Sequence, residues 1–184
     1  MLDGIGEDLR DAVDFLHEFQ GLPLACGQDD PIGTGGNGVA RMAANAGWSV
    51  ASIDSEPHGG TCALRGCDPK KMLVAVTEGV EWAENMEGKG LEAQPSVNWP
   101  DMIAFKRSFT DAMPPRIEAG LEKAGIDVLH GEVRFTGPDA IELNGETLRA
   151  KHFHIATGAR PMTLNIPGEE YLATSTDFLE LPER

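Results

Sequence analysis

The stretch GTGGNGVARMAANAGWSVASID, residues 33–54, decides the fold. Its glycines precede an alanine-rich segment with helical character, and WSVASI is typical of a β-strand. A glycine-rich turn, a helix and a strand in this order make half of a βαβ unit. The sequence therefore predicts an α/β domain around a parallel sheet.

The glycines fit a dinucleotide-binding fingerprint. Gly33 would make the tight turn, Gly35 would let backbone N–H groups reach a pyrophosphate, and Gly38 would permit close helix packing. Asp54 follows Gly38 by 16 residues, which suits an acid that binds the adenosine ribose. The alternative is a glycine-rich helix start with a surface aspartate. GQDDP, just before the fingerprint, favours that alternative because a buried strand rich in Val and Ile is expected there.

A second motif, GGTCALRGCDPKK at residues 59–71, sets Cys62 and Cys67 five positions apart. In one regular helix they would be separated by roughly 7.5 Å along the axis, too far for a disulfide. We therefore expect an irregular turn ahead of a helix that runs from Lys70 to about residue 86, with Pro69 at its start. The N-terminus of this helix, with Lys70 and Lys71, would stabilise a thiolate at Cys67.

These thiols are interpreted as a redox pair, and no metal site is predicted. A metal site of His58, Cys62 and Cys67 is the alternative, but a fourth ligand has no obvious candidate. Three cysteines are too few for a secreted disulfide scaffold, so a reducing compartment is expected. Cys26 lies in an apolar stretch and is predicted to be buried and inert.

The remaining segments predict mixed structure. Apolar spacing predicts an amphipathic helix over residues 6–20 and a helical segment over 101–124, broken at Pro114 and Pro115. Short strands are expected within residues 126–135, 140–145 and 146–158 and in the proline-rich tail, with a hairpin turn at Asn144 and Gly145. His154 is expected to be a packed core histidine rather than a catalyst.

Composition limits the function. The chain of 184 residues has 41% hydrophobic residues, which suits one globular domain. Thirty acidic and fifteen basic residues give a formal net charge of −15, which disfavours nucleic acid and anionic membranes as partners. No apolar run is long enough to span a membrane, and the acidic N-terminus is unlike a signal peptide. A cytoplasmic location is therefore expected.

The two motifs together resemble those of the FAD-dependent pyridine nucleotide-disulfide oxidoreductases, the family of glutathione reductase, dihydrolipoamide dehydrogenase and mercuric reductase. HGEVRFTG and HIATGARP follow in matching order. The resemblance implies a Rossmann-like, three-layer FAD-binding domain with a small antiparallel β element. GQDDP departs from that pattern, so either residues 22–25 form the first strand out of register or the sheet lacks it. The resemblance covers residues 32–184, and residues 1–31 would be an N-terminal helical extension.

The resemblance also implies roles for individual residues. Cys62 would exchange with a disulfide substrate, Cys67 would face the flavin, and Lys71 would lie beside the flavin ring. The other residues implied in FAD binding are Gly33, Gly35, Gly36, Gly38, Asp54, Thr61, Val133, Ala156, Thr157 and Gly158.

The implied activity is electron transfer from NAD(P)H through FAD to the Cys62–Cys67 disulfide, and then to a disulfide or similar electrophilic small molecule. In this family a NAD(P)-binding domain and a dimerisation domain follow, and the latter supplies a His-Glu acid–base pair. This chain is expected to lack both, so NAD(P)H would act only if a partner chain supplied the missing domains. We therefore expect a fragment or one part of a split enzyme.

Two alternatives stay open. One is a non-catalytic remnant or interaction module that no longer binds FAD, and the other is a small dithiol protein that works without flavin.

Overall fold

The structure is a computed structural model that describes residues 35–92, 95–159 and 161–183. The chain divides into two compact units, the first made of residues 1–59 and 114–158 and the second of residues 60–113 and 159–184. The predicted N-terminal helix, the GQDDP segment, Cys26 and Gly33 lie outside the described residues. The predicted boundary between residues 31 and 32 lies there too and stays a prediction.

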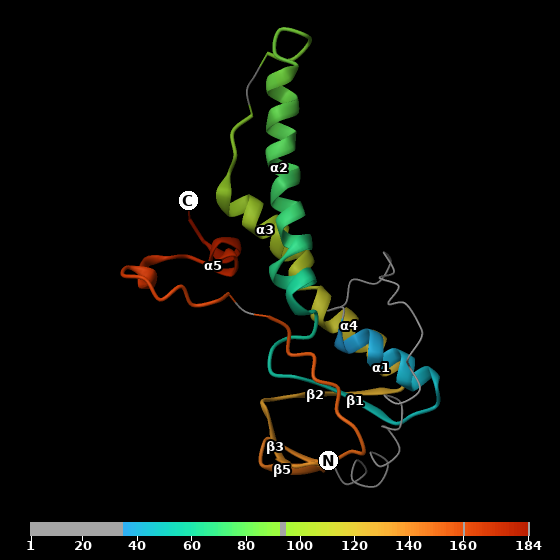
Figure 1. The fold of residues 1–184 in the computed structure, drawn as a ribbon. Helices are drawn as coiled ribbons and strands as arrows, with labels where there is room; N and C mark the ends of the chain where they lie inside the picture. The colour runs from blue at the N-terminus through green and yellow to red at the C-terminus, as the bar shows by residue number, and fades with distance from the viewer. Residues whose placement is uncertain (1–34, 93–94, 160, 184) are drawn as a thin grey trace, which may run out of the picture. The chain divides into compact units, whose positions relative to one another are not determined.

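The first unit contains the predicted parallel pairing (Figure 1). Helix α1 (Gly36–Asn45) leads into strand β1 (Val50–Asp54), which pairs in parallel with strand β2 (Ile126–His130). The register aligns Asp54 with His130, so both strands end at the same edge. Helix α1 lies against both strands. Helix α4 (Met113–Lys123) precedes β2, and its Ile117 and Leu121 are buried.

An antiparallel sheet completes this unit. It consists of β3 (Val133–Gly137), β4 (Ala140–Leu143) and β5 (Glu146–Arg149), in that order. The hairpin turn at Asn144 and Gly145 is confirmed, since their φ angles are 52° and 85°. The Asn144 side chain donates a 2.9 Å hydrogen bond from Nδ2 to the His130 carbonyl. This bond ties the hairpin to the end of β2.

Helices make up the second unit. It contains the π-helical turn η3 (Thr61–Arg65), α2 (Cys67–Asn85), α3 (Trp99–Thr110), the 3-10 turn η4 (Glu169–Tyr171) and α5 (Ser175–Glu180). Helix α3 lies across α2 (Figure 1). The core of this unit consists of Leu73 from α2, Met102 and Ile103 from α3, and Leu179 from α5.

A buried lysine joins α3 to α5. The Lys106 side chain is fully buried, and its Nζ donates a 2.9 Å hydrogen bond to the Leu179 carbonyl and pairs with Glu180. Arg107 pairs with the same carboxylate at 3.0 Å. Partial burial acts to raise the pKa of Glu180, but the hydrogen bonds and charges of Lys106 and Arg107 outweigh it and lower that pKa. A buried charge in the helical core is thereby neutralised.

Several predicted boundaries are wrong. Helix α2 begins at Cys67 rather than Lys70, because Lys70 N–H already bonds to the Gly66 carbonyl. Of residues 146–158 only 146–149 form a strand, and His154 is exposed rather than packed in a core. The tail, predicted to form strands, instead carries α5, whose Thr174 and Asp177 make a capping box. None of the helices among the described residues is both long and apolar enough to cross a membrane.

Candidate functional site

The glycine turn ends at Gly35, which caps α1 without any side-chain hydrogen bond. The first turn of α1 holds no acidic residue, and N–H groups in a first helical turn have no intrahelical partner. Such a set of donors fits a phosphate group. A Cβ atom added to Gly36 would lie 3.4 Å from the Ala156 Cβ atom. The structure therefore brings Ala156, distant in sequence, against the glycine turn.

The role of Gly38 stays a prediction. Among the described residues nothing lies within 4 Å of a Cβ atom added there. Asp54 ends β1, as predicted, and its carboxylate accepts a 2.9 Å hydrogen bond from Glu56 N–H. A half-buried carboxylate beyond a parallel strand suits hydroxyl groups of a sugar.

The other residues predicted to bind FAD divide between the units. Val133, at the start of β3, is 45% exposed, and Thr157 and Gly158 are exposed outside any helix or strand. Thr61 and Lys71 belong to the second unit and are exposed as well. The roles of all these residues stay predictions.

Both thiols lie at the π-helical turn. Cys62 belongs to η3 and Cys67 begins α2, so the expected irregular turn is present. The turn brings the two residues together, since Cys67 is a hydrogen-bond partner of the Cys62 side chain. Burial raises the pKa of the Cys62 thiol above its usual value, and the neighbouring Cys67 and Asp68 add to the rise. Both thiols are free, with Cys62 half-buried and Cys67 exposed.

Glycines make this turn sterically possible. Gly59 and Gly60 have φ angles of 148° and 62°, a region that other residues rarely adopt. Gly66 lies against the start of the turn, since a Cβ atom there would be 2.8 Å from the Thr61 carbonyl oxygen. The glycines of the GGTC part are therefore explained by their backbone angles, and the glycine of the RGC part by its close contact with the Thr61 backbone.

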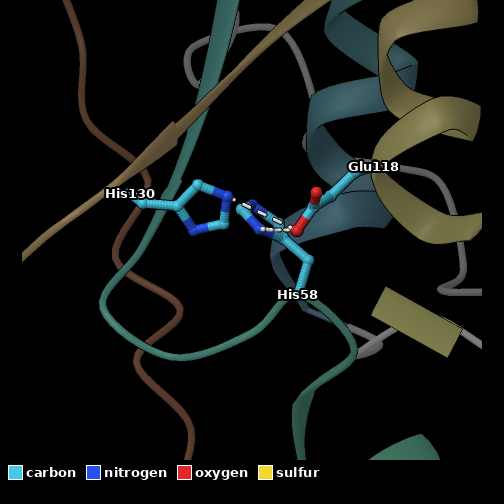
Figure 2. A group of neighbouring side chains, drawn as sticks. All are labelled: His58, Glu118 and His130. Atoms are coloured by element: carbon cyan, nitrogen blue, oxygen red, sulfur yellow. Dashed lines mark ion pairs between the residues drawn. The ribbon is translucent and has the colours of Figure 1, made fainter. Parts of the chain in front are cut away.

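A cluster that the sequence analysis missed lies in the first unit. His58, Glu118 and His130 direct their side chains toward one another (Figure 2). Burial lowers the pKa of His58, against the opposing charges of Asp54 and Glu118. One signal was available in the sequence, because His58 and His130 stand at or just beyond the ends of two strands. Their meeting required the parallel pairing of those strands and the placement of α4.

Comparisons with known proteins identify the family of this chain. The family described as Pyridine nucleotide-disulphide oxidoreductase matches residues 32–183. Glutathione reductase from Burkholderia cepacia is 34% identical over 154 residues, which are 82% of this chain and 34% of that protein. Dihydrolipoyl dehydrogenase from Thermus scotoductus is 35% identical over 155 residues, which are 83% of this chain and 34% of that protein.

A solved structure is also similar. The HOCl-induced flavoprotein disulfide reductase RclA from Escherichia coli matches with a TM-score of 0.64 and 25% identity, over 79% of this chain and 32% of that chain. This match supports the Rossmann-like α/β fold with its small antiparallel sheet. The chain spans about a third of the length of the relatives that it matches.

Proposed function

The chain belongs to the pyridine nucleotide-disulphide oxidoreductase family, and we propose that it is the FAD-binding part of a flavin-dependent disulfide reductase. Enzymes of this family use FAD and NAD(P)H. The observation that carries the proposal is the contact between the two thiols: Cys62 lies in the π-helical turn, Cys67 begins α2, and Cys67 is a hydrogen-bond partner of the Cys62 side chain. Because both thiols are free, the pair can cycle between dithiol and disulfide.

The first unit has groups suited to the nucleotide part of FAD. The uncapped first turn of α1 would bind the pyrophosphate, and Asp54 would accept hydrogen bonds from the ribose. Ala156, which packs on the glycine turn, would help to shape that surface. When bound, FAD supplies the two electrons that return the Cys62–Cys67 disulfide to the dithiol.

The cysteines themselves would carry out thiol–disulfide exchange. The Cys62 thiolate attacks one sulfur of the substrate disulfide, which forms a mixed disulfide and releases one substrate thiolate that takes up a proton. Cys67 then attacks the Cys62 sulfur, which forms the Cys62–Cys67 disulfide and releases the second substrate thiol. The substrate gains two electrons, and the cysteine pair loses two.

The raised pKa of Cys62 indicates that this thiol needs a base. An ordinary thiol is already mostly protonated near neutral pH, burial raises the pKa of Cys62 further, and only the thiolate is nucleophilic. We propose that a partner chain supplies both the base and the NAD(P)H-binding domain. A cytoplasmic location fits a couple that must be kept partly reduced.

Exposed apolar side chains in the tail support a partner. Met162, Leu164, Ile166, Tyr171 and Leu172 are all more than half exposed within a short segment. A run of this kind is unusual on the surface of an isolated protein.

Absorbance spectroscopy tests the proposal. The purified chain is incubated with FAD, desalted, and compared with a Gly36→Val variant, whose larger side chain would meet Ala156. Retained flavin absorbance that the variant loses is the expected result. Reduction with a dithiol should then produce a long-wavelength band that is absent from Cys67→Ser, if that thiolate lies against the flavin.

The exchange step has its own test. A chromogenic aromatic disulfide is mixed with Cys67→Ser and, separately, with Cys62→Ser. Cys67→Ser should accumulate a mixed disulfide at Cys62 at a rate that rises with pH, because the Cys62 thiol must first lose its proton, and Cys62→Ser measures the separate reactivity of the exposed Cys67. A colourless desalted protein with unreactive cysteines would instead favour the non-catalytic interaction module, and reactive cysteines without flavin would favour a small dithiol protein.

A further inference from the structure

We propose that His58, Glu118 and His130 form a binding site for one divalent transition-metal ion, best suited to Zn²⁺. One ligand atom from each residue lies within 4.8 Å of the others. His58 Nδ1 is 3.5 Å and His130 Nε2 is 3.4 Å from the same carboxylate oxygen, Glu118 Oε1. Ligands about 2.0–2.1 Å from a tetrahedral Zn²⁺ are separated by about 3.3–3.4 Å, so two of the three separations already fit.

The second observation is a buried ring nitrogen that lacks a hydrogen bond of normal geometry. His58 is 2% exposed, and the contact of its Nδ1 with Glu118 Oε1 is a 3.5 Å ion-pair contact. Buried polar atoms without a partner are rare because each one carries a desolvation cost. A cation between Nδ1 and the carboxylate would remove that cost for both groups.

Ser52 lies where it can form the outer hydrogen bond that orients a metal-ligating histidine. Its Oγ lies 3.3 Å from His58 Nε2, the ring nitrogen opposite the site. If Nε2–H donates to this hydroxyl, Nδ1 keeps its lone pair directed at the site. Metal-binding histidines are commonly oriented through such an outer hydrogen bond.

The fold holds the three ligands on separate elements. His58 follows β1, Glu118 lies on α4, and His130 ends β2, as Figure 2 shows. The Asn144 hydrogen bond to the His130 carbonyl fixes the backbone at the third ligand. All three residues belong to the first unit.

The site is open on one side. The His130 side chain is 53% exposed and that of Glu118 is 28% exposed, so an ion can enter and water can complete a fourth position. Two histidines, one carboxylate and a water make a ligand set that Zn²⁺ uses in proteins. Binding would join the segment before Gly59 and Gly60 to both α4 and β2.

Metal titration of the full chain tests the site. The chain is prepared without an affinity tag in a Cys62→Ser/Cys67→Ser background, stripped with a chelator, and titrated with Zn²⁺ against a chromogenic chelator. Co²⁺ is used in parallel, since its visible spectrum reports tetrahedral geometry and its near-ultraviolet spectrum reports thiolate ligands. The test variants are His130→Asn and Glu118→Gln, and the matched control is His154→Asn, another exposed histidine.

One equivalent of Zn²⁺ should bind, and both test variants should weaken binding at least tenfold while His154→Asn leaves it unchanged. Ser52→Ala should weaken binding roughly 10–100-fold. The Co²⁺ complex should be tetrahedral and lack a thiolate band. His58 is left unaltered because it is buried, and circular dichroism verifies that each variant is folded. The absence of binding by the folded background protein, or equal affinity in folded His130→Asn, would overturn the proposal.

Discussion

Replacing Gly66 with alanine should damage the turn that carries the thiols. A Cβ atom there would lie 2.8 Å from the Thr61 carbonyl oxygen and 3.3 Å from its carbon, so the backbone must move. Overpacking of this kind costs about 1–3 kcal/mol. Gly79→Ala in α2 is the matched control, since a Cβ atom at Gly79 meets nothing within 4 Å.

Both substitutions reduce the entropy of the unfolded chain by a similar amount, so that effect cancels in the comparison. Gly79→Ala should stabilise the chain by about 0.5–1 kcal/mol, because alanine is the better helix former. Gly66→Ala should therefore be less stable than Gly79→Ala by at least the packing cost. With a urea m-value of about 2 kcal/mol/M, a difference of roughly 0.5–1.5 M in the unfolding midpoint is expected.

The same pair of variants tests the chemistry of the turn. Oxidised dithiothreitol should form the Cys62–Cys67 disulfide more slowly in Gly66→Ala than in Gly79→Ala, because a shifted turn separates the thiols. Free-thiol titration measures the rate. Equal urea midpoints and equal oxidation rates in the two variants would refute the reasoning that Gly66 is required by its contact with Thr61.

Three further outcomes are expected. The pKa of Glu180 is lower in the folded chain than its unfolded value of about 4.5. The ionised carboxylate therefore stabilises the fold above pH 4.5, and this contribution is lost as the pH falls through the folded pKa. The urea unfolding midpoint should drop with acid more in the parent chain than in Glu180→Gln. The pKa of His58 is lowered from 6.5 in the folded chain, so the free energy of unfolding should fall as the pH drops below 6.5. An NMR titration in the presence of a chelator should show the His58 ring titrating below that value, and a titration midpoint above 6.5 would contradict this. Gly145→Ala should destabilise the chain by about 1–2 kcal/mol, because φ is 85° there and alanine is strained at that angle. No described atom lies within 4 Å of the added Cβ atom, so a steric clash does not contribute. An unchanged free energy of unfolding in urea would contradict the strain argument.

Part of the candidate site was predictable because it depends on local rules. The helix after the glycine turn, β1 ending at Asp54, and the Asn144–Gly145 hairpin follow from periodicity and preferred backbone angles. The need for an irregular turn at the cysteines follows from helix geometry alone. Residues 150–158 were mispredicted since an apolar, β-favouring run forms a strand only where a partner strand is available, and β5 ends at residue 149.

The sequence by itself determined the order of elements, the dithiol motif and the family resemblance, because each is written in neighbouring residues. Only the tertiary structure decided which distant side chains meet. Parallel pairing of β1 with β2 brings His130 toward His58, and α4 adds Glu118. Burial of Lys106 beside α5 likewise depends on how helices pack. Contacts between residues far apart in the chain depend on register and packing, which no local pattern of residues encodes.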